Sequence, residues 1–369
     1  MADWSDWKDR VRLTLFISDL VPGDAVSGDC LEMQTILRKW GFPSEIYVER
    51  VGDQLRDRVK LFNEYREVDN ELIIFHYSTW SQMADYLRSR PDRNLVMKYH
   101  NITPPEFFRG ANPLAMELTG KGREALSSFA PVTLLGLGDS EFNRLELAAA
   151  GFQITGVLPI TIDFAGLDGE PNREVLRIFK DDWVNLLFVG RVAPNKRHED
   201  VAKAFYYYRR LNPRSRLFFV GAQDISHTYR SWLAGVLERM GISGDVHFTG
   251  HTSHAELLSY YHLADVFICM SDHEGFCVPL VESMHLGVPV LAYGSTAVPY
   301  TLGDGGIVLH RKDFRATAEV VHLLVTDHTL RSRLIARGRR RALDFSRENV
   351  EKQFAGYLVQ ALENWKKLQ

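Results

Sequence analysis

Short apolar runs alternate along the whole chain with longer stretches in which apolar residues recur at helical spacing. Runs that are brief, rich in β-branched and aromatic residues and free of polar alternation are typical of strands buried on both faces. Such runs cover residues 11–17, 45–48, 72–76, 95–99, 132–137, 153–158, 184–189, 217–220, 246–248, 266–270 and 307–309. The stretches between them predict helices, including residues 114–129, 140–150, 196–211, 228–240 and 255–263. Regular alternation of this kind predicts an α/β fold with parallel, doubly wound sheets.

The alternation is interrupted between residues 159 and 182. This segment contains Gly166, Gly169 and Pro171 among several charged residues, which is typical of a connection between domains. The chain of 369 residues is long enough to give each half a sizeable core. We therefore expect one domain over residues 1–165 and a second over residues 166–345, followed by a terminal helix within residues 346–369.

The stretch at residues 266–290 has the clearest order of features. Its apolar run ends in a polar loop, after which Pro279 suits the first turn of a helix and Gly287 suits the helix end. Glu274 then lies on the loop, and Glu282 lies in the first helical turns. In an open parallel sheet, ligands bind at the carboxyl ends of the strands, and a helix start attracts anions. The pattern predicts a phosphate site flanked by two carboxylates that accept sugar hydroxyls.

A basic turn follows the predicted strand at residues 184–189. Arg191 and Lys196 lie five residues apart between this strand and the next helix, so both can reach one point at the strand's carboxyl end. A diphosphate needs such a pair, because arginine offers a planar fork of donors and lysine a mobile point charge. We expect these two residues to bind phosphate, whereas a solvated basic turn is the simpler interpretation of Arg197 and Arg209.

Composition and charge narrow the class of protein. Hydrophobic residues make up 45% of the chain and charged residues 25%, as in soluble globular proteins, and the net charge of -3 argues against a general nucleic-acid binder. The cysteines, Cys30, Cys269 and Cys277, have neither metal-ligand spacing nor a disulfide framework, which favours a reducing cytoplasm. The first residues do not resemble a signal peptide, and no apolar run approaches the ~20 residues that span a bilayer.

A basic stretch near the C-terminus leaves a peripheral membrane contact open. Its arginines can touch anionic lipid head groups, and a solvated helix face explains them equally well. They are Arg331, Arg333, Arg337, Arg339, Arg340 and Arg341. We therefore expect a cytoplasmic protein, either free or peripheral to the inner face of the plasma membrane. The sequence does not indicate an oligomeric state.

Glu274 and Glu282, separated by seven residues and accompanied by Gly275 and Phe276, resemble the signature of the family 4 (group 1) retaining glycosyltransferases. The Gly-Arg-x-x-x-x-Lys segment that begins at Gly190 is also close to the pattern of this family. The resemblance is tight in the second half of the chain and looser in the first. It implies the GT-B fold, in which two Rossmann-like domains face each other across a cleft and the last helix crosses back to the first domain.

The same resemblance assigns roles to residues of the second domain. Glu274 would grip the donor sugar, and Glu282 would accept hydrogen bonds from the ribose. The leaving diphosphate would be held by Arg191 and Lys196. The full donor site implied is Arg191, Lys196, Glu274, Gly275, Phe276, Cys277, Val278 and Glu282.

The first domain supplies two further candidates. His100 resembles the histidine that faces the donor sugar in this family, and its place at a strand's carboxyl end favours it over His76. It joins Glu274, Arg191 and Lys196 as an expected catalytic residue. Gly28 lies in a predicted turn at residues 21–29 that corresponds to the family's glycine-bearing first loop. The common Gly-Gly pair is missing there, so an ordinary turn is an equal alternative.

The implied reaction is the retaining, metal-independent transfer of a hexose from a nucleotide-diphosphate sugar. GDP-mannose and UDP-hexoses are the leading donors, and the acceptor is a saccharide, a lipid-linked sugar or a small molecule in glycan biosynthesis. The alternatives are a nucleotide-sugar epimerase, a phosphorylase on the same fold and a non-catalytic protein that binds sugar nucleotides. Base contacts are expected from the loops near Gly221–Asp224 and His247–Thr252, where nothing separates uracil from guanine.

No metal and no cofactor are expected. The basic pair and the helix start would neutralise the leaving diphosphate, and the chain has no Asp-x-Asp motif of the kind that holds a metal in the other major transferase fold. A dinucleotide site is excluded because Gly136-Leu137-Gly138 is followed by Glu141 where the third glycine would stand.

Overall fold

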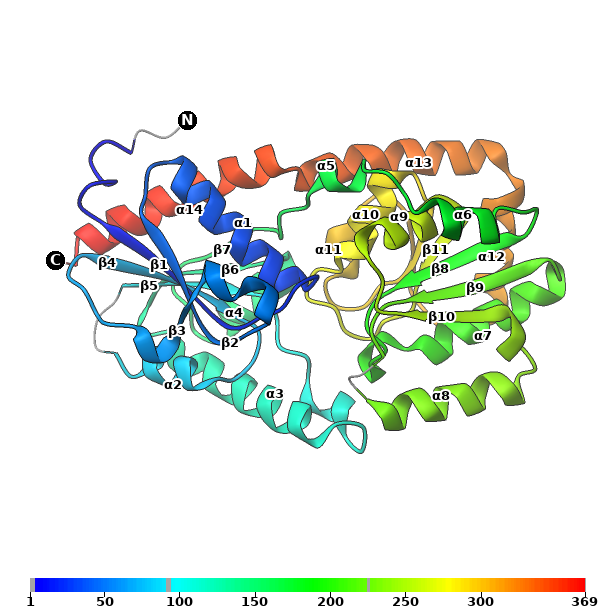
Figure 1. Cartoon of the computed structure of the whole chain (residues 1–369), viewed down its shortest axis with the longest axis horizontal. Helices are drawn as coiled ribbons and strands as arrows, with labels where there is room; N and C mark the ends of the chain where they lie inside the picture. Colours follow the sequence, from blue (N-terminus) through cyan, green and yellow to red (C-terminus); the bar gives the residue numbers. More distant parts are fainter. Residues whose placement is uncertain (1–3, 91–93, 224–225, 369) are drawn as a thin grey trace. The chain divides into compact units, whose positions relative to one another are not determined.

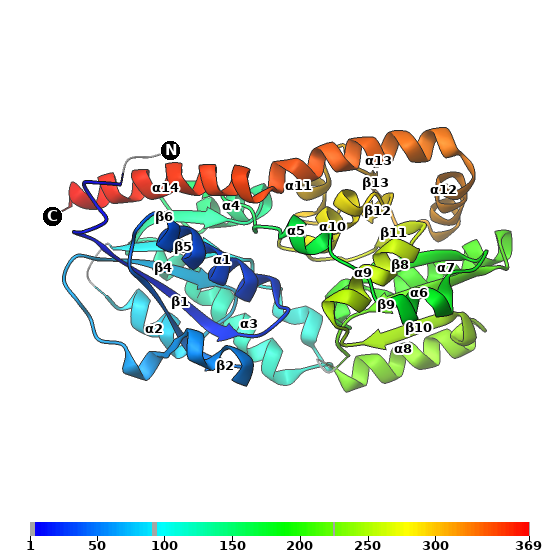
Figure 2. The same cartoon turned by 45° about the horizontal axis from the view of Figure 1, so that its top comes forward.

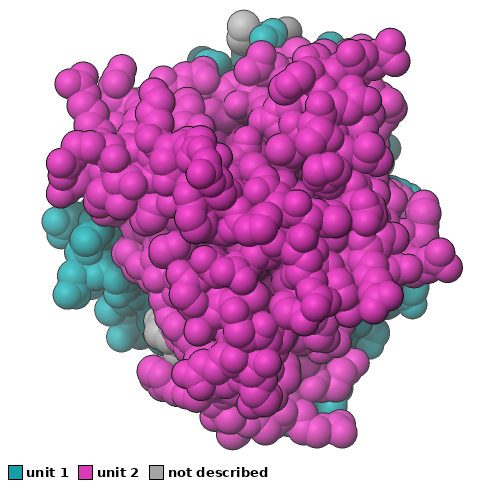
Figure 3. Space-filling view, turned by 90° about the vertical axis from the view of Figure 1, so that its right-hand side faces the viewer, with its two compact units in different colours: residues 1–105, 114–161, 347–369 teal, residues 106–113, 162–346 magenta. Residues whose placement is uncertain are grey.

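The computed structural model describes residues 4–90, 94–223 and 226–368, and the chain folds into two compact units (Figures 1 and 3). Unit 1 comprises residues 1–105, 114–161 and 347–369, and unit 2 comprises residues 106–113 and 162–346. Each unit has its own parallel sheet with helices on its faces. The prediction of two doubly wound α/β domains is confirmed.

The sheet of unit 1 has the strand order β3-β2-β1-β4-β5-β6-β7, and its paired strands are parallel. The strands are β1 (Arg12–Leu20), β2 (Ser44–Val51), β3 (Lys60–Leu61), β4 (Glu71–Tyr77), β5 (Leu95–Tyr99), β6 (Thr133–Gly138) and β7 (Thr155–Val157). All the strands predicted for the first half are present. The prediction missed β3, because two residues are too few to show a pattern.

Helices cover both faces of this sheet, and alternate residues of β1 point to opposite sides. Leu13 and Leu15 pack with the helices α1 and α14, which cover one face (Figure 2), whereas Phe16 joins a separate cluster with the helices α2 and α4. The helices of unit 1 are α1 (Ala25–Lys39), α2 (Gln82–Arg88), α3 (Pro113–Ala125), α4 (Glu141–Ala149) and α14 (Arg347–Lys366). Burial on both faces explains why the strands read as continuous apolar runs.

The terminal helix α14 is part of the core of unit 1. Phe354, Leu358 and Leu362 follow one another at four-residue spacing and are buried in the same cluster as α1. The ring of Phe354 lies 5.3 Å from that of Trp40, and Lys39 donates to Glu351 at 2.8 Å. The chain therefore leaves unit 1 after residue 161 and returns to it at residue 347.

The sheet of unit 2 has the order β10-β9-β8-β11-β12-β13, and its strand pairs are also parallel. Its strands are β8 (Val184–Val189), β9 (Ser215–Val220), β10 (Val246–Gly250), β11 (Val266–Cys269), β12 (Val290–Tyr293) and β13 (Ile307–Leu309). Strand order reverses between β8 and β11, as it does between β1 and β4 in unit 1. Such reversals open a crevice at the carboxyl ends of the strands where ligands bind in doubly wound sheets.

The helices of unit 2 are α5 (Phe164–Leu167), α6 (Arg173–Phe179), α7 (His198–Leu211), α8 (His227–Arg239), α9 (His254–Leu263), α10 (Val278–Leu286), α11 (Val298–Leu302), α12 (Phe314–Thr326) and α13 (His328–Ala342). The short helices α5 and α6 lie in the segment predicted as an irregular connection. Short 3-10 segments occur at Asp53–Arg58, Phe62–Glu64, Pro105–Phe108, Leu126–Phe129, Pro194–Lys196, Ser243–Asp245 and Leu343–Phe345. Within the described residues, no helix has the length and apolar character needed to cross a bilayer.

Candidate functional site

The turn from β11 into α10 presents the first glutamate of the sequence motif. Cys277 adopts a left-handed φ of 71° directly before α10, Pro279 occupies the first helical turn, and Gly287 ends the helix at a φ of 75°. These limits of α10 are those that the sequence predicts. Two contacts of Phe276 hold the turn in place. The Phe276 ring packs on Phe345 with centroids 5.2 Å apart, and the Phe276 carbonyl accepts from the Thr301 hydroxyl at 2.6 Å.

The backbone of this turn is held by two neighbouring loops. Thr296 accepts from the Glu274 N–H and donates to the Glu274 carbonyl, both at 2.9 Å. Asn195, in the turn after β8, donates to the His273 carbonyl at 3.2 Å and accepts from the Asp272 N–H at 2.9 Å. Thr296 and Asn195 were not predicted, since both contacts depend on which loops meet at the sheet edge. They fix where Glu274 and Lys196 lie relative to each other.

Lys196 and Glu274 form the central pair of the site. Lys196 Nζ lies 2.6 Å from Glu274 Oε2, and the Glu274 side chain is only 5% exposed. Burial alone would lower the pKa of Lys196, but the attraction of the Glu274 carboxylate raises it above its usual range. The other carboxylate oxygen, Oε1, is buried and has no hydrogen-bond partner among the described residues. A buried acceptor without a partner is costly, so this oxygen is suited to a ligand hydroxyl.

Arg191 lies on the same edge of the sheet, in the turn after β8. It is exposed, and its guanidinium makes no hydrogen bond or ion pair to the residues that the structure describes. The turn passes very close to the loop after β9, because a Cβ on Gly221 would stand 2.4 Å from the Gly190 carbonyl oxygen. Glycine is required at that contact. The structure therefore leaves Arg191 available to an anion and holds Lys196 against Glu274.

Glu282 lies inside α10 and is held differently. Its Oε2 accepts from the Tyr261 hydroxyl at 2.5 Å. Burial raises the pKa of Glu282, although the Tyr261 bond opposes this effect. The sequence did not predict Tyr261, which lies in α9 and has a fully buried ring.

A pair of thiols lies beneath Glu274. Ligand atoms of Cys269, Glu274 and Cys277 all lie within 4.8 Å of one another, although the spacing of the cysteines in the sequence suggested no metal site. Cys269 lies at the end of β11, and the left-handed backbone of Cys277 turns its side chain back toward that strand. The bond from Cys269 and burial together raise the pKa of the Cys277 thiol well above its usual range. A thiol binds a metal as the thiolate, so the raised pKa of Cys277 and the Lys196 ammonium beside Glu274 both disfavour a cation here.

A network of charges continues from this turn. Lys312 contacts Asp272 at 2.6 Å and Asp200 at 2.8 Å, and Arg197 contacts Asp272 at 3.0 Å. Arg197 has a left-handed φ of 52°, so α7 begins at His198 and the predicted start at Lys196 is wrong. Pro194–Lys196 forms a separate 3-10 turn instead. Besides the Lys196–Glu274 pair, these ion pairs therefore also link the turn after β8 to the turn after β11.

A hollow of about 570 Å³ opens beside the loops that follow β9 and β10. Arg230 lies on its wall, with the guanidinium 3.8 Å from the centre of the Phe248 ring and Nε donating to Gln223 Oε1 at 2.7 Å. The lining consists of Ala222, Gln223, His227, Arg230, Gly250 and His251. Both loops predicted to contact a base therefore supply lining residues, whereas Asp224 lies outside the described residues.

The basic stretch on α13 is largely paired within unit 2. Arg331 donates to the Asp265 carbonyl at 2.6 Å, and Arg341 donates to the Tyr300 carbonyl at 2.5 Å. Arg337 and Arg340 both lie near Asp304, at 3.3 and 3.6 Å. These contacts give Arg331 and Arg341 a structural role, and the membrane contact stays a prediction.

In unit 1, the turn predicted at residues 21–29 is wrong beyond Asp24. The Asp24 side chain accepts from the Ser27 N–H at 3.1 Å, and this N-cap starts α1 at Ala25. Gly28 is therefore helical, and a Cβ added there would meet nothing within 4 Å. Packing does not require glycine at this position, and its donor contact stays a prediction.

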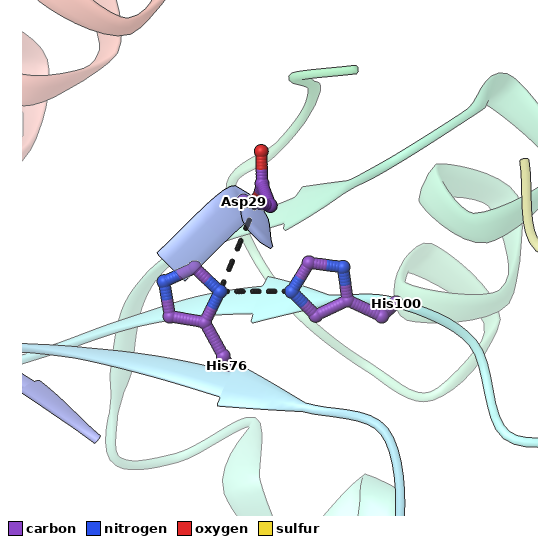
Figure 4. A group of neighbouring side chains, drawn as sticks. All are labelled: Asp29, His76 and His100. Carbon is purple, nitrogen blue, oxygen red and sulfur yellow. Dashed lines mark hydrogen bonds and ion pairs between the residues drawn. The ribbon is translucent and has the colours of Figure 1, made fainter. Parts of the chain in front are cut away.

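His100 follows β5, and its ring is held by both nitrogens. Nδ1 lies 2.8 Å from Asp139 Oδ2, and Nε2 lies 2.9 Å from Nδ1 of His76, its rival in the sequence (Figure 4). Both histidine side chains are fully buried. The sequence singled out both histidines, but not Asp139 or their other neighbour, Asp29. All four belong to elements at the carboxyl edge of one parallel sheet, but which of them meet depends on the strand order, which the sequence does not contain.

Comparisons with known proteins agree with this arrangement. Residues 168–341 match the family described as glycosyl transferases group 1. O-antigen chain mannosyltransferase B of Escherichia coli is 28% identical over 277 residues, which cover 73% of this chain and 70% of that protein. D-inositol 3-phosphate glycosyltransferase of Thermobifida fusca is 29% identical over 240 residues, covering 62% of this chain and 55% of that protein.

Solved structures with the same fold cover nearly the whole chain. HepE of Anabaena, in complex with UDP and glucose, has a TM-score of 0.75 at 17% identity and covers 95% of this chain and 99% of its own. Sucrose-phosphate synthase of Thermosynechococcus elongatus has a TM-score of 0.75 at 17% identity, with 96% and 100% covered. The likeness identifies the fold as GT-B.

Proposed function

We propose that the chain is a group 1 glycosyltransferase that transfers a hexose from a nucleotide-diphosphate sugar with retention of configuration and without a metal ion. GDP-mannose and UDP-hexoses are the proposed donors. The acceptor is a saccharide, a lipid-linked sugar or a small molecule in glycan biosynthesis. The E. coli relative is named a mannosyltransferase and the HepE structure contains UDP and glucose, so both kinds of donor need to be tested.

The diphosphate is proposed to bind between Arg191, Lys196 and the start of α10. Two positive side chains and the unpaired N–H groups of a helix start together supply the charge that a metal ion supplies elsewhere. Arg191 is exposed and unpaired among the described residues, and Lys196 keeps its proton at neutral pH because Glu274 raises its pKa. As charge develops on the leaving phosphate, these donors stabilise it without reorganisation. We propose front-face transfer, in which the acceptor attacks from the face that the diphosphate leaves and the leaving phosphate helps to deprotonate the acceptor.

The two glutamates are proposed to act on different parts of the donor. Glu274 accepts from the transferred sugar through Oε1, while the N–H groups of Gly275, Phe276, Cys277 and Val278 line the turn around it. Glu282 accepts from the ribose, because it lies one helical turn further into α10. The hollow beside the loops after β9 and β10 lies at the same carboxyl edge of the sheet as Lys196 and Glu274, and it is proposed to hold the base.

Two residues of unit 1 are also proposed to contact the donor. His100 contributes from the end of β5, and Gly28 contributes from the first turn of α1. In the structure both ring nitrogens of His100 are hydrogen-bonded within unit 1 and its side chain is fully buried, so the proposed contact requires the ring to exchange one of these partners for the donor.

One observation carries the proposal: the Lys196–Glu274 pair at 2.6 Å leaves a buried carboxylate oxygen that has no partner among the described residues, beside an exposed arginine and a helix start. Thermal-shift measurements with GDP-mannose, UDP-glucose, UDP-galactose, GDP and UDP, each in excess chelator, test it. Binding of a nucleotide sugar raises the melting temperature by mass action. The proposal requires a rise with at least one nucleotide sugar that is reduced in Lys196→Ala, and a flat response to the whole set contradicts it.

A further inference from the structure

The hollow beside the loops after β9 and β10 is joined to the turn that carries Arg191. The Val192 N–H donates to the Ala222 carbonyl at 2.8 Å, and the Gly221 N–H donates to the Gly250 carbonyl at 3.2 Å. Ala222 and Gly250 both line the hollow. A ligand group in this hollow therefore lies next to the turn after β8, where the diphosphate is proposed to bind.

Arg230 is held in a fixed orientation on the wall of the hollow. It belongs to α8, which lies beside β10 in unit 2 (Figures 1 and 2). The Arg230 guanidinium lies 3.8 Å from the centre of the Phe248 ring, and its Nε donates to Gln223 Oε1 at 2.7 Å. Phe248 is itself packed against Phe219, with ring centroids 5.1 Å apart. Because Nε is used, Nη1 and Nη2 of Arg230 remain as a planar fork of donors.

This fork has no partner in the part of the chain that the structure describes. No hydrogen bond or ion pair joins Nη1 or Nη2 of Arg230 to residues 4–90, 94–223 or 226–368, although the residue is half-buried. Burial lowers the pKa of the Arg230 guanidinium. Arg209 on the neighbouring helix α7, by contrast, is paired with Asp245 at 2.7 Å. A half-buried cation without a counter-charge is stabilised by acceptor atoms of a ligand.

The groups beside Arg230 add donors to the same wall. The Gln223 side-chain oxygen already accepts from Arg230, so the amide nitrogen with its two hydrogens is the end left for a ligand. Both backbone carbonyls of the hollow named above already accept N–H groups. His227 and His251 can each donate or accept, because a neutral imidazole has one nitrogen of each kind. The fixed polar groups of the hollow therefore favour a ligand edge that consists of acceptors.

Among the common bases, guanine has such an edge. Its O6 and N7 are adjacent acceptors, and a bidentate arginine is the commonest specific partner of this pair. Adenine has an amino group where guanine has O6, so it would place donors against the fork. Uracil has two acceptors, O2 and O4, but the N3–H donor stands between them. Only guanine can therefore accept from both arms of the arginine along one edge.

We propose that the hollow is specific for guanine, and that Arg230 binds O6 and N7 of the base through Nη1 and Nη2. This inference rests on the proposed function, because it names the base that the proposed base site takes. It narrows the donors to sugars of guanosine diphosphate. A uridine nucleotide would be held by its ribose and diphosphate contacts alone.

Calorimetry with free nucleotides tests the base without the sugar. The full chain is titrated with GDP, UDP, inosine diphosphate and 7-deaza-GDP. Inosine diphosphate lacks the 2-amino group but keeps O6 and N7, whereas 7-deaza-GDP has a C–H group in place of N7. We expect GDP to bind about tenfold to a hundredfold more tightly than UDP, since a bidentate pair discriminates by this amount. Inosine diphosphate should stay within about threefold of GDP, and 7-deaza-GDP should bind about threefold to tenfold more weakly.

Three variants assign the selectivity to Arg230. Arg230→Ala removes the fork, and Arg230→Lys keeps a positive charge without the fork. Arg239→Ala is the matched control, because Arg239 is an exposed arginine in the last turn of the same helix. Both Arg230 variants should bind GDP about tenfold more weakly and UDP within about threefold of the wild type, while Arg239→Ala changes neither affinity. Retained UDP binding and the melting temperature show that each variant is folded.

The outcomes separate this inference from the proposed function. Equal affinities of GDP and UDP in the wild type, or tighter binding of UDP, would overturn the guanine assignment. An equal loss of both nucleotides in Arg230→Ala would also overturn it, because Arg230 would then contact phosphate. If 7-deaza-GDP binds as tightly as GDP, Arg230 stacks on the base and does not bind its edge. All three results leave the proposed function standing, whereas the absence of binding by both GDP and UDP contradicts the function and the inference together.

Discussion

At the scale of single residues, the central feature is Lys196, which pairs with Glu274 and is also proposed to bind the diphosphate. Lys196 is bonded to Glu274, yet its side chain keeps 24% of its surface exposed, so it can contact an anion at the same time. Glu274 in turn needs Lys196, because a buried carboxylate without a cation is destabilised. Arg191 makes no comparable ion pair with any of the described residues. The two basic residues therefore differ in what their loss does to folding.

Lys196→Ala and Arg191→Ala are both expected to weaken binding of the nucleotide diphosphate by about tenfold to a hundredfold, since a charge-assisted hydrogen bond contributes roughly 1.5–3 kcal/mol. Lys196→Ala should also lower the free energy of unfolding by roughly 1–3 kcal/mol because it strands Glu274, while Arg191→Ala should leave it unchanged. Calorimetry and urea unfolding measure the two effects. Arg214→Ala is the matched control, because Arg214 lies at the opposite, amino end of β9 and pairs with Asp182. Equal binding in all three variants would remove the phosphate assignment.

The two glutamates are expected to separate kinetically. Glu282→Gln keeps a partner for Tyr261 and should mainly raise the KM for the donor, because ribose contacts are similar in the ground and transition states. Glu274→Gln should mainly lower kcat, since contacts to the sugar tighten as its ring becomes cation-like. Free GDP or UDP is the control ligand, because it contains the ribose but lacks the transferred hexose. Its affinity should fall in Glu282→Gln and hold or rise in Glu274→Gln, where Lys196 is released; a fall in Glu274→Gln as large as in Glu282→Gln shows the assignment to be wrong.

The residues that the sequence predicted are those whose chemistry is visible in one short segment. Arg191, Lys196, Glu274 and Glu282 each stand in a strand–turn–helix pattern, so their place at a sheet edge follows from local order. Thr296, Asn195 and Asp139 were not predictable in the same way. Each acts through a contact with a loop or strand far along the chain, as Asp139 does with His100, and the sequence does not reveal which loops meet.

At the scale of elements, the start of α7 combines a strained residue with a buried histidine. Arg197 is left-handed, and the next residue, His198, is fully buried with its ring 4.7 Å from Phe188 and 4.9 Å from Phe219. Neither ring nitrogen of His198 has a hydrogen-bond partner among the described residues. Burial, assisted by the charges of Lys196 and Arg230, lowers the pKa of His198 to about 3.

This histidine makes folding sensitive to acid. Below the usual pKa of about 6.5, His198 is protonated in the unfolded chain but stays neutral in the folded chain. The free energy of unfolding therefore falls as the pH falls toward 3. The loss is about 1.4 kcal/mol between pH 7.5 and 5.5 from this residue. His198→Phe keeps the aromatic packing and the backbone N–H bond to Tyr229, and it removes the titration. Urea unfolding at the two pH values should show a drop smaller by that amount in His198→Phe; an equal drop in both proteins contradicts the argument.

Element limits were predictable where proline or glycine set them. Pro279 and Gly287 mark α10 in the sequence because each has a backbone preference that acts locally. The start of α1 was missed because the glycines at residues 23 and 28 suggested a longer turn, whereas Asp24 caps the helix before Gly28 is reached. The start of α7 was predicted two residues too early, because the left-handed backbone of Arg197 delays the helix to His198. A left-handed arginine has no sequence pattern.

At the scale of the whole molecule, two sheets of the same kind carry the candidate residues at corresponding places. In unit 2, Arg191 and Lys196 follow β8 and Glu274 follows β11, the two strands between which the order reverses. In unit 1, Asp29 lies in the helix after β1 and His76 lies in β4, the strands at the equivalent reversal. Alternating apolar runs predicted both sheets, because burial on both faces leaves a clear trace in the sequence. Which residues would meet at each reversal needed the strand order, which the sequence does not contain.

The proposed chemistry at this scale is retention without a metal ion. The most direct test is 1H nuclear magnetic resonance of the full chain with an α-linked donor, GDP-mannose or UDP-glucose, in excess EDTA, recorded before the released sugar mutarotates. We expect release of the nucleotide diphosphate and a first-formed sugar in the α configuration, with Lys196→Ala slower by one or more powers of ten. A first-formed β sugar, or turnover that stops in EDTA and returns with magnesium or manganese, would contradict it.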